Sequence, residues 1–114
     1  MTKDPIVKLG VVGAGFVGQH AHISSYANLA SCRIVALAEL RPELRRRVAN
    51  RYEIPRTYAT HLELLEDPEV EAVVAVTARP MTGPIALDCL NAGRHVLTEK
   101  HMASTVEQAE TLVE

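Results

Sequence analysis

The sequence predicts a doubly wound α/β fold, with about five parallel strands in the order 3-2-1-4-5. Two observations predict it. Apolar, β-branched segments alternate along the chain with helical segments of roughly ten residues, which is the pattern of βαβ units. A glycine cluster, GAGFVG, follows the first apolar segment directly and opens a helical pattern. Because crossovers in such units are right-handed, the carboxyl ends of the strands are expected to meet at one edge of the sheet.

The expected strands are the apolar segments of this alternation. CRIVALAE and VEAVVAVT are nearly all apolar, as in strands that are covered on both faces. The five strands are expected at residues 6–12, 32–38, 56–58, 72–77 and 95–98.

Capping residues and glycine set the boundaries of the expected helices. Thr60 to Glu63 and Ser104 to Glu107 have capping-box spacing, and Gly93 is a helix stop. Helices are expected at residues 16–30, 41–52 and 61–66, before Gly93, and from 104 onward. The helix at residues 41–52 is expected to carry Leu44 and Val48 on its inner face. The helix before Gly93 is expected to carry Ile85, Ala86, Cys89 and Leu90 on its inner face.

Length and composition indicate one globular domain. The chain has 114 residues, 47% of them hydrophobic and 23% charged, with a net charge of -2. That charge argues against a nucleic-acid or anionic-membrane partner, and no apolar run approaches the ~20 residues of a membrane span. The start lacks the features of a signal peptide, so a cytoplasmic protein is expected. Cys32 and Cys89 are expected to be reduced thiols, and no metal site is expected.

Gly13 to Gly18 form the motif G-x-G-x-x-G in the strand–turn–helix context that indicates dinucleotide binding. Gly13 is expected to make the tight turn, Gly15 to let the backbone approach a pyrophosphate, and Gly18 to let the helix pack against the strand. The helix N-terminus would supply free N–H groups for the phosphates. The loop residues expected at the cofactor are therefore Gly13, Gly15, Phe16, Val17 and Gly18.

Glu39 ends the second expected strand, twenty-one residues after Gly18. An acidic side chain there accepts the hydroxyl protons of the adenosine ribose and repels a 2′-phosphate, which favours NAD. Arg41 leaves NADP open as the alternative, because an arginine nearby can stack on adenine or reach that phosphate.

The ends of the last two strands complete the expected edge. Thr77, Ala78 and Arg79 follow the fourth strand, and Glu99 and Lys100 follow the fifth. The segments GVVGAGFVGQHAH and AGRHVLTEK, with the acidic end of strand two, resemble the N-terminal domain of the glucose–fructose oxidoreductase/inositol dehydrogenase/rhizopine-catabolism (Gfo/Idh/MocA) family.

This resemblance implies a Rossmann domain of an enzyme that transfers hydride between a nicotinamide cofactor and a sugar, cyclitol or related polyol. It places Lys100 as the catalytic residue beside the nicotinamide and Glu99 at the cofactor near its ribose. The sequence departs from the family at His101, where proline is usual, and at Ala78, Arg79 and Thr82, where a Thr-Pro-Asn loop and a histidine are usual. These departures concern the class of substrate rather than the fold.

The remaining polar candidates have simpler explanations. His20 and His22 are two apart, which does not place them on one helix face as a metal pair. His22 is expected to pack beside the glycine loop. The arginines of the second helix are expected to form a solvated face: Arg41, Arg45, Arg46, Arg47 and Arg51.

Residues 1–114 are therefore expected to be the N-terminal cofactor domain, without the C-terminal α/β substrate domain of the family, and to be inactive alone. The alternative is a stand-alone nucleotide-binding or edge-pairing module without redox activity. The fifth strand is expected to present an open edge through which a homo-oligomer could form. A methyltransferase with the same glycine loop is disfavoured by the Lys100 segment.

Overall fold

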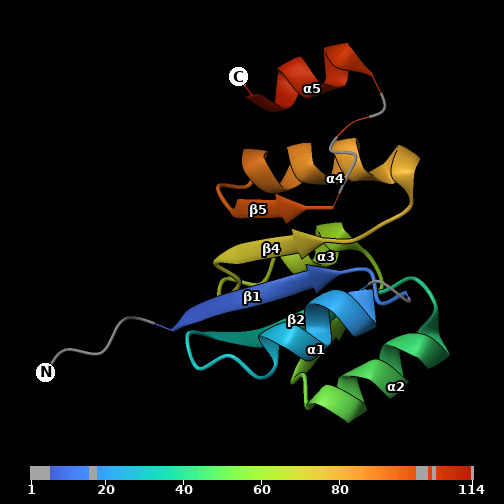
Figure 1. The fold of residues 1–114 in the computed structure, drawn as a ribbon, viewed down its shortest axis with the longest axis vertical. Coiled ribbons are helices and arrows are strands. Elements are labelled where there is room, and N and C mark those ends of the chain that lie inside the picture. The colour runs from blue at the N-terminus through green and yellow to red at the C-terminus, as the bar shows by residue number, and fades with distance from the viewer. Residues whose placement is uncertain (1–5, 16–17, 100–102, 104, 114) are drawn as a thin grey trace, which may run out of the picture.

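The computed structural model describes residues 6–15, 18–99, 103 and 105–113. Its centre is a five-stranded, wholly parallel sheet in the order β3-β2-β1-β4-β5 (Figure 1). The strands are β1 (Val7–Val12), β2 (Cys32–Ala38), β3 (Arg56–Tyr58), β4 (Ala72–Ala75) and β5 (His95–Thr98). The doubly wound fold and the strand order predicted from the sequence are confirmed.

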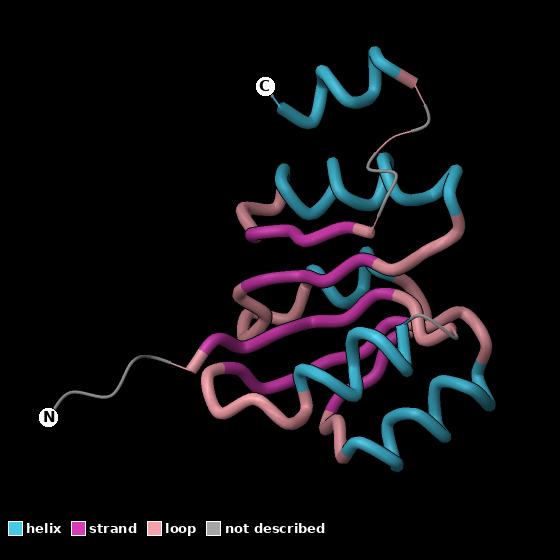
Figure 2. Tube along the Cα trace, in the orientation of Figure 1, coloured by secondary structure: helices cyan, strands magenta, loops and turns pink. Residues whose placement is uncertain are grey.

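Helices cover both faces of the sheet (Figure 2). They are η1 (Gly18–Ile23, a wide π-type helix) and α1 (Ser24–Tyr26), which are continuous, then α2 (Pro42–Tyr52), α3 (His61–Leu65), α4 (Arg79–Asn91) and α5 (Val106–Val113). The first helix and α2 pack on one face, α3 and α4 on the other, and α5 lies beyond α4.

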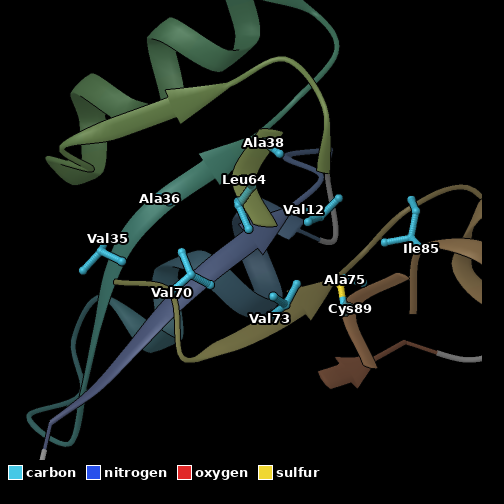
Figure 3. Close-up of a cluster of buried hydrophobic side chains, with 10 residues drawn as sticks. All are labelled: Val12, Val35, Ala36, Ala38, Leu64, Val70, Val73, Ala75, Ile85 and Cys89. Atoms are coloured by element: carbon cyan, nitrogen blue, oxygen red, sulfur yellow. The ribbon is translucent and has the colours of Figure 1, made fainter. Parts of the chain in front are cut away.

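Two apolar layers hold the sheet between these helices. On the α3–α4 side, Leu64, Val73 and Cys89 are at most 1% exposed and belong to the cluster shown in Figure 3. On the other side, Ile23 and Val48 pack against the same sheet. Because the central strands are buried on both faces, their sequences are continuously apolar rather than alternating.

Several expected boundaries differ from the structure. The first helix ends at Tyr26 rather than residue 30, because tighter turns follow, in which the Asn28 and Leu29 amides bond the carbonyls three residues back. Strand β4 ends at Ala75 rather than residue 77, since both neighbouring ladders end there. Leu90 is 43% exposed rather than inward, because it lies about 100° around the helix from Cys89.

Of the two predicted N-terminal caps, the one at Thr60 is confirmed. Thr60 Oγ1 accepts a hydrogen bond from the Glu63 amide at 3.3 Å, which is the N-cap half of a capping box. The Glu63 carboxylate accepts from the Thr60 hydroxyl at 3.1 Å rather than from the Thr60 amide. At α5 the described cap is Thr105, whose Oγ1 accepts from the Gln108 amide at 3.1 Å. Ser104, the expected cap, lies outside the described residues.

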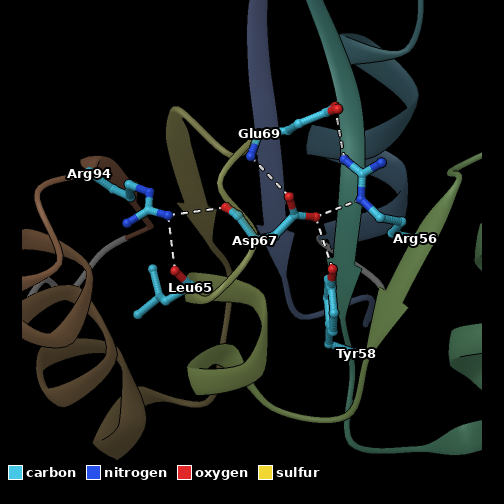
Figure 4. Close-up of polar contacts among 6 residues, drawn as sticks. All are labelled: Arg56, Tyr58, Leu65, Asp67, Glu69 and Arg94. Carbon is cyan, nitrogen blue, oxygen red and sulfur yellow. Dashed lines mark hydrogen bonds and ion pairs between the residues drawn. The ribbon is translucent and has the colours of Figure 1, made fainter.

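A polar network ties together the amino ends of β3, β4 and β5 (Figure 4). The buried Asp67 carboxylate accepts from Arg56 Nε at 2.6 Å, Tyr58 Oη at 2.9 Å and the Glu69 amide at 3.0 Å. The Arg94 guanidinium donates to the main-chain oxygens of Leu65, Asp67, Val70 and Ala92. This network stabilises the amino end of the sheet, opposite the carboxyl edge at which the predicted cofactor residues lie.

Candidate functional site

Two of the motif glycines are required by the fold itself. Gly13 has φ +97°, and a Cβ atom there would lie 2.0 Å from the Val76 carbonyl oxygen at the end of β4. A Cβ at Gly18 would lie 2.8 Å from the Gly13 carbonyl oxygen. Any side chain at either position would therefore meet backbone atoms. The turn that ends β1 closes against β4 only with glycine at both places.

Gly15 is glycine for a different reason. Its φ is not positive, and among the described residues the only atom within 4 Å of an added Cβ is Arg41 Nη2, at 3.8 Å. Nothing in the part of the chain that the structure describes excludes a side chain there, so the space beside Gly15 suits the close approach of a ligand. This space, which a Cβ would fill, fits a nucleotide pyrophosphate. Phe16 and Val17, also expected at the cofactor, lie outside the described residues.

Glu39 connects the glycine loop to the end of β2. It is 6% exposed, and its Oε1 accepts a hydrogen bond from the Ala14 amide at 2.9 Å while Oε2 accepts from the Arg41 amide at 2.9 Å. Burial works to raise the pKa of Glu39, but hydrogen bonds from the Arg41 side chain and from these two amides outweigh it, so the pKa is lowered. The side chain is thus an ionised carboxylate beside the loop.

Arg41 lies over that carboxylate. Its Nε donates to Oε2 at 2.9 Å and its Nη2 to Oε1 at 3.1 Å, in the two-pronged geometry that guanidinium and carboxylate groups favour. The Arg41 side chain is 65% exposed, and Nη2 also borders Gly15. Three predicted cofactor residues, Gly15, Glu39 and Arg41, are therefore brought together.

His22 and Glu99 form a contact that the sequence did not predict. His22 Nε2 lies 2.5 Å from Glu99 Oε1, and His22 Nδ1 lies 3.0 Å from Tyr26 Oη. His22 is buried, as expected, but it also contacts the Glu99 carboxylate rather than acting as a packing residue alone. The pKa of Tyr26 is raised, first by burial and then by the nearby Cys32 and Glu99. Seventy-seven residues separate His22 from Glu99, so no local pattern signals the pair.

Two threonine hydroxyls lie close together near the end of β4. Thr77 Oγ1 lies 3.3 Å from Oγ1 of the buried Thr82, and Ala78 is exposed at the N-terminus of α4. Arg79 is the first residue of α4, but its side chain is not among those described. Lys100 and His101 likewise lie outside the described residues. No group of histidine, cysteine or acidic residues suited to a metal occurs in the described part of the chain.

Comparison with known proteins gives the family of the chain. Residues 7–114 match the model of the oxidoreductase family with an NAD-binding Rossmann fold, Gfo/Idh/MocA. The chain belongs to this family. The resemblance predicted from the sequence is confirmed, and with it the assignment of the chain as an NAD-binding oxidoreductase domain.

None of the helices in the described ranges is long and apolar enough to cross a membrane.

Relatives in this family include dehydrogenases of cyclitols. The chain is 32% identical over 109 residues to an inositol 2-dehydrogenase/D-chiro-inositol 3-dehydrogenase of Shouchella clausii, covering 95% of this chain and 32% of the relative. It is 31% identical to an uncharacterized oxidoreductase of Rhizobium meliloti, covering 96% and 33% respectively. The chain thus spans about a third of the length of the curated relatives it matches.

Solved structures show the same fold. An apo scyllo-inositol dehydrogenase of Lactobacillus casei superposes with a TM-score of 0.91 at 20% identity, over 98% of this chain and 33% of that one. A 3-ketoreductase of Actinomadura kijaniata, solved with TDP-benzene and NADP, has a TM-score of 0.86 at 25% identity, over 95% and 34%.

Proposed function

We propose that this chain is the N-terminal cofactor domain of an oxidoreductase that transfers hydride between nicotinamide and a sugar, cyclitol or related polyol. The observation that carries the proposal is the placement of an open Gly15, an ionised Glu39 and, three strands away, Glu99 along the carboxyl edge of one sheet. Ligands of open α/β sheets bind at that edge. The inositol dehydrogenases among the relatives support a polyhydroxylated substrate.

Each described residue has a role in binding. Gly15 admits the pyrophosphate to the backbone, Glu39 accepts hydroxyl protons of the adenosine ribose, and Glu99 faces the ribose at the nicotinamide end. Thr77 and Ala78, in the loop after β4, and Arg79, the first residue of α4, are proposed to contact the cofactor between its two riboses. The bound nicotinamide supplies the hydride chemistry. The protein's task is then to orient the cofactor and to manage the alcohol proton.

Lys100 is the proposed proton-handling group. It follows Glu99 directly, and a lysine close to a cationic ring loses its proton more readily. In an intact enzyme that contains this domain, Lys100→Ala is expected to lower kcat by about 10²-fold or more, the usual contribution of a general acid–base group. Unchanged turnover would contradict the assignment.

Arg41 supports NADP as a second candidate cofactor. Its guanidinium neutralises Glu39 and leaves further N–H donors directed away from the carboxylate, so a 2′-phosphate could bind there. NAD is the first candidate because Glu39 stands at the end of β2.

The rest of the substrate site is proposed to lie in a second domain of the whole protein, as the greater length of the relatives suggests. Association of two copies through β5 is also proposed, since in the described sheet β5 pairs only with β4. The competing hypothesis is a nucleotide-binding or edge-pairing module without redox chemistry.

Calorimetric titration of the 114-residue chain with NADH and NADPH tests the binding role. Saturable binding of either cofactor that is weakened by Glu39→Ala is the expected result. Failure of both cofactors to bind at millimolar concentration would contradict it. Cofactor binding by a whole protein that turns over no sugar, cyclitol or polyol would favour the module without redox chemistry.

A further inference from the structure

The His22–Glu99 pair spans the carboxyl end of β4. His22 lies in the helix that follows β1, and Glu99 directly follows β5, while β4 lies between these two strands in the sheet. The contact therefore joins the helix that begins at the glycine loop to the end of β5. Backbone bonds reinforce the same edge: the Val76 amide donates to Val12 O at 2.8 Å, and the Glu99 amide to Ala75 O at 3.4 Å.

The His22 ring is held on both sides. Its side chain is 11% exposed, its Nε2 contacts Glu99, and its Nδ1 contacts the Tyr26 hydroxyl one helical turn later. The two rings are 5.6 Å apart and tilted by 45°. With a partner at each ring nitrogen, the imidazole has little freedom to rotate. Glu99 is less enclosed, with 40% of its side chain exposed, so its carboxylate is accessible to a ligand.

We infer that His22 is a positioning residue for the cofactor. It holds the Glu99 carboxylate in the orientation that accepts the hydroxyl protons of the ribose attached to nicotinamide, and Tyr26 holds the His22 ring. Fixing Glu99 before the ligand arrives removes the entropic cost of ordering a flexible glutamate on binding. This role rests on the proposed function, because it requires the nicotinamide ribose to bind beside Glu99.

A purely structural pair would behave differently. If His22 and Glu99 only tied the helix to β5, losing the pair would weaken every nucleotide ligand alike, through a disturbed glycine loop. A positioning role concerns one half of the cofactor. ADP carries the adenosine and both phosphates but lacks the second ribose, so it is the matched control ligand.

The experiment titrates the wild-type chain, His22→Leu, His22→Gln and Glu99→Gln with NADH and with ADP. His22→Leu is expected to weaken NADH binding about tenfold, the scale of one lost charge-assisted hydrogen bond, and to leave ADP binding unchanged. His22→Gln, which keeps an N–H donor, is expected to restore most of the affinity. Tyr26→Phe is expected to weaken NADH binding by about threefold, because it removes only the support of the ring.

A double-mutant cycle completes the test. His22→Leu combined with Glu99→Gln is expected to bind NADH no more weakly than Glu99→Gln alone, since His22 acts through Glu99. Equal losses of NADH and ADP affinity, or additive losses in the double mutant, would overturn the inference. If His22→Leu does not fold, Tyr26→Phe carries the same comparison of NADH with ADP. No NADH binding by the wild type would instead refute the proposed function.

Discussion

The guanidinium of Arg41 and the carboxylate of Glu39 meet edge to edge, with Nε 2.9 Å from Oε2 and Nη2 3.1 Å from Oε1. The amides of Ala14 and Arg41 donate to the same two oxygens. These donors occupy the roughly four acceptor positions of a carboxylate. The two amides belong to the backbone, so the guanidinium is the donor that ribose hydroxyls would have to replace.

Removing the Arg41 side chain is therefore expected to change the two cofactor affinities in opposite directions. In Arg41→Ala, NADH should bind severalfold more tightly because Glu39 is released, while NADPH should bind about tenfold more weakly because a cationic partner of the 2′-phosphate is lost. Calorimetric titration with both cofactors measures the effect.

Arg46→Ala is the matched control, because Arg46 is an exposed arginine of α2, the helix that Arg41 directly precedes, and its loss removes the same charge. It is expected to change neither affinity by more than about twofold. Equal changes in Arg41→Ala and Arg46→Ala would show that general charge, rather than the pair with Glu39, sets the preference.

The motif glycines are expected to separate into two classes. Gly13→Ala should unfold or strongly destabilise the chain, because the added Cβ would lie 2.0 Å from the Val76 oxygen at a backbone with φ +97°. Gly15→Ala should keep the wild-type melting temperature within a few degrees but weaken NADH binding tenfold or more, since only the ligand needs that space. Thermal unfolding and titration of both variants decide this; a destabilised Gly15→Ala would contradict it.

Asp67 is expected to make the chain sensitive to acid. Burial works to raise the pKa of Asp67, but hydrogen bonds from Arg56, the Glu69 amide and Tyr58 outweigh it, so the pKa is lowered. A lowered folded-state pKa stabilises the fold above the unfolded value of about 3.9 and loses that contribution as the pH falls through the folded pKa. Asp67→Asn should therefore be about 2 kcal/mol less stable near neutral pH.

Urea unfolding at several pH values tests this expectation. The difference between wild type and Asp67→Asn should be constant above about pH 5 and shrink below about pH 4. Glu39, whose pKa is also lowered, is present in both proteins and cancels. Glu69→Gln is the control, because Glu69 pairs with Arg56 at the surface and is expected to matter by less than about 1 kcal/mol. A pH-independent difference would be the contrary result.

Cys89 is expected to be inert in the folded chain. Burial, followed by the neighbouring Asp88 charge, raises the pKa of the Cys89 thiol to about 11, so almost no thiolate forms at neutral pH. In Cys32→Ser, a thiol-reactive dye at pH 8 should label nothing until denaturant is added. Cys89→Ser should be labelled slowly when folded, at the partly exposed Cys32. Rapid labelling of folded Cys32→Ser would refute the expectation.

The sequence alone determined most of the fold. Apolar periodicity located all five strands, and the connection rules for βαβ units placed them in their observed order. It also placed Gly13 and Glu39 correctly at the edge, because each immediately follows a strand, and Gly15 in the turn that begins at Gly13. Where it failed, as at the end of the first helix and at Leu90, the outcome depended on competing turns and on small rotations around a helix axis.

Only the tertiary structure decided how the polar side chains of the edge pair. Parallel strands bring together residues that are far apart in sequence, so His22 meets Glu99 across the end of β4 although no spacing rule relates them. Arg41 is two residues from Glu39, yet whether it points at the carboxylate or into solvent depends on how the loop before α2 turns beside Gly15. Backbone topology follows from the burial of apolar residues along the chain, whereas these pairings follow from distances of a few ångströms that arise only once the sheet has assembled.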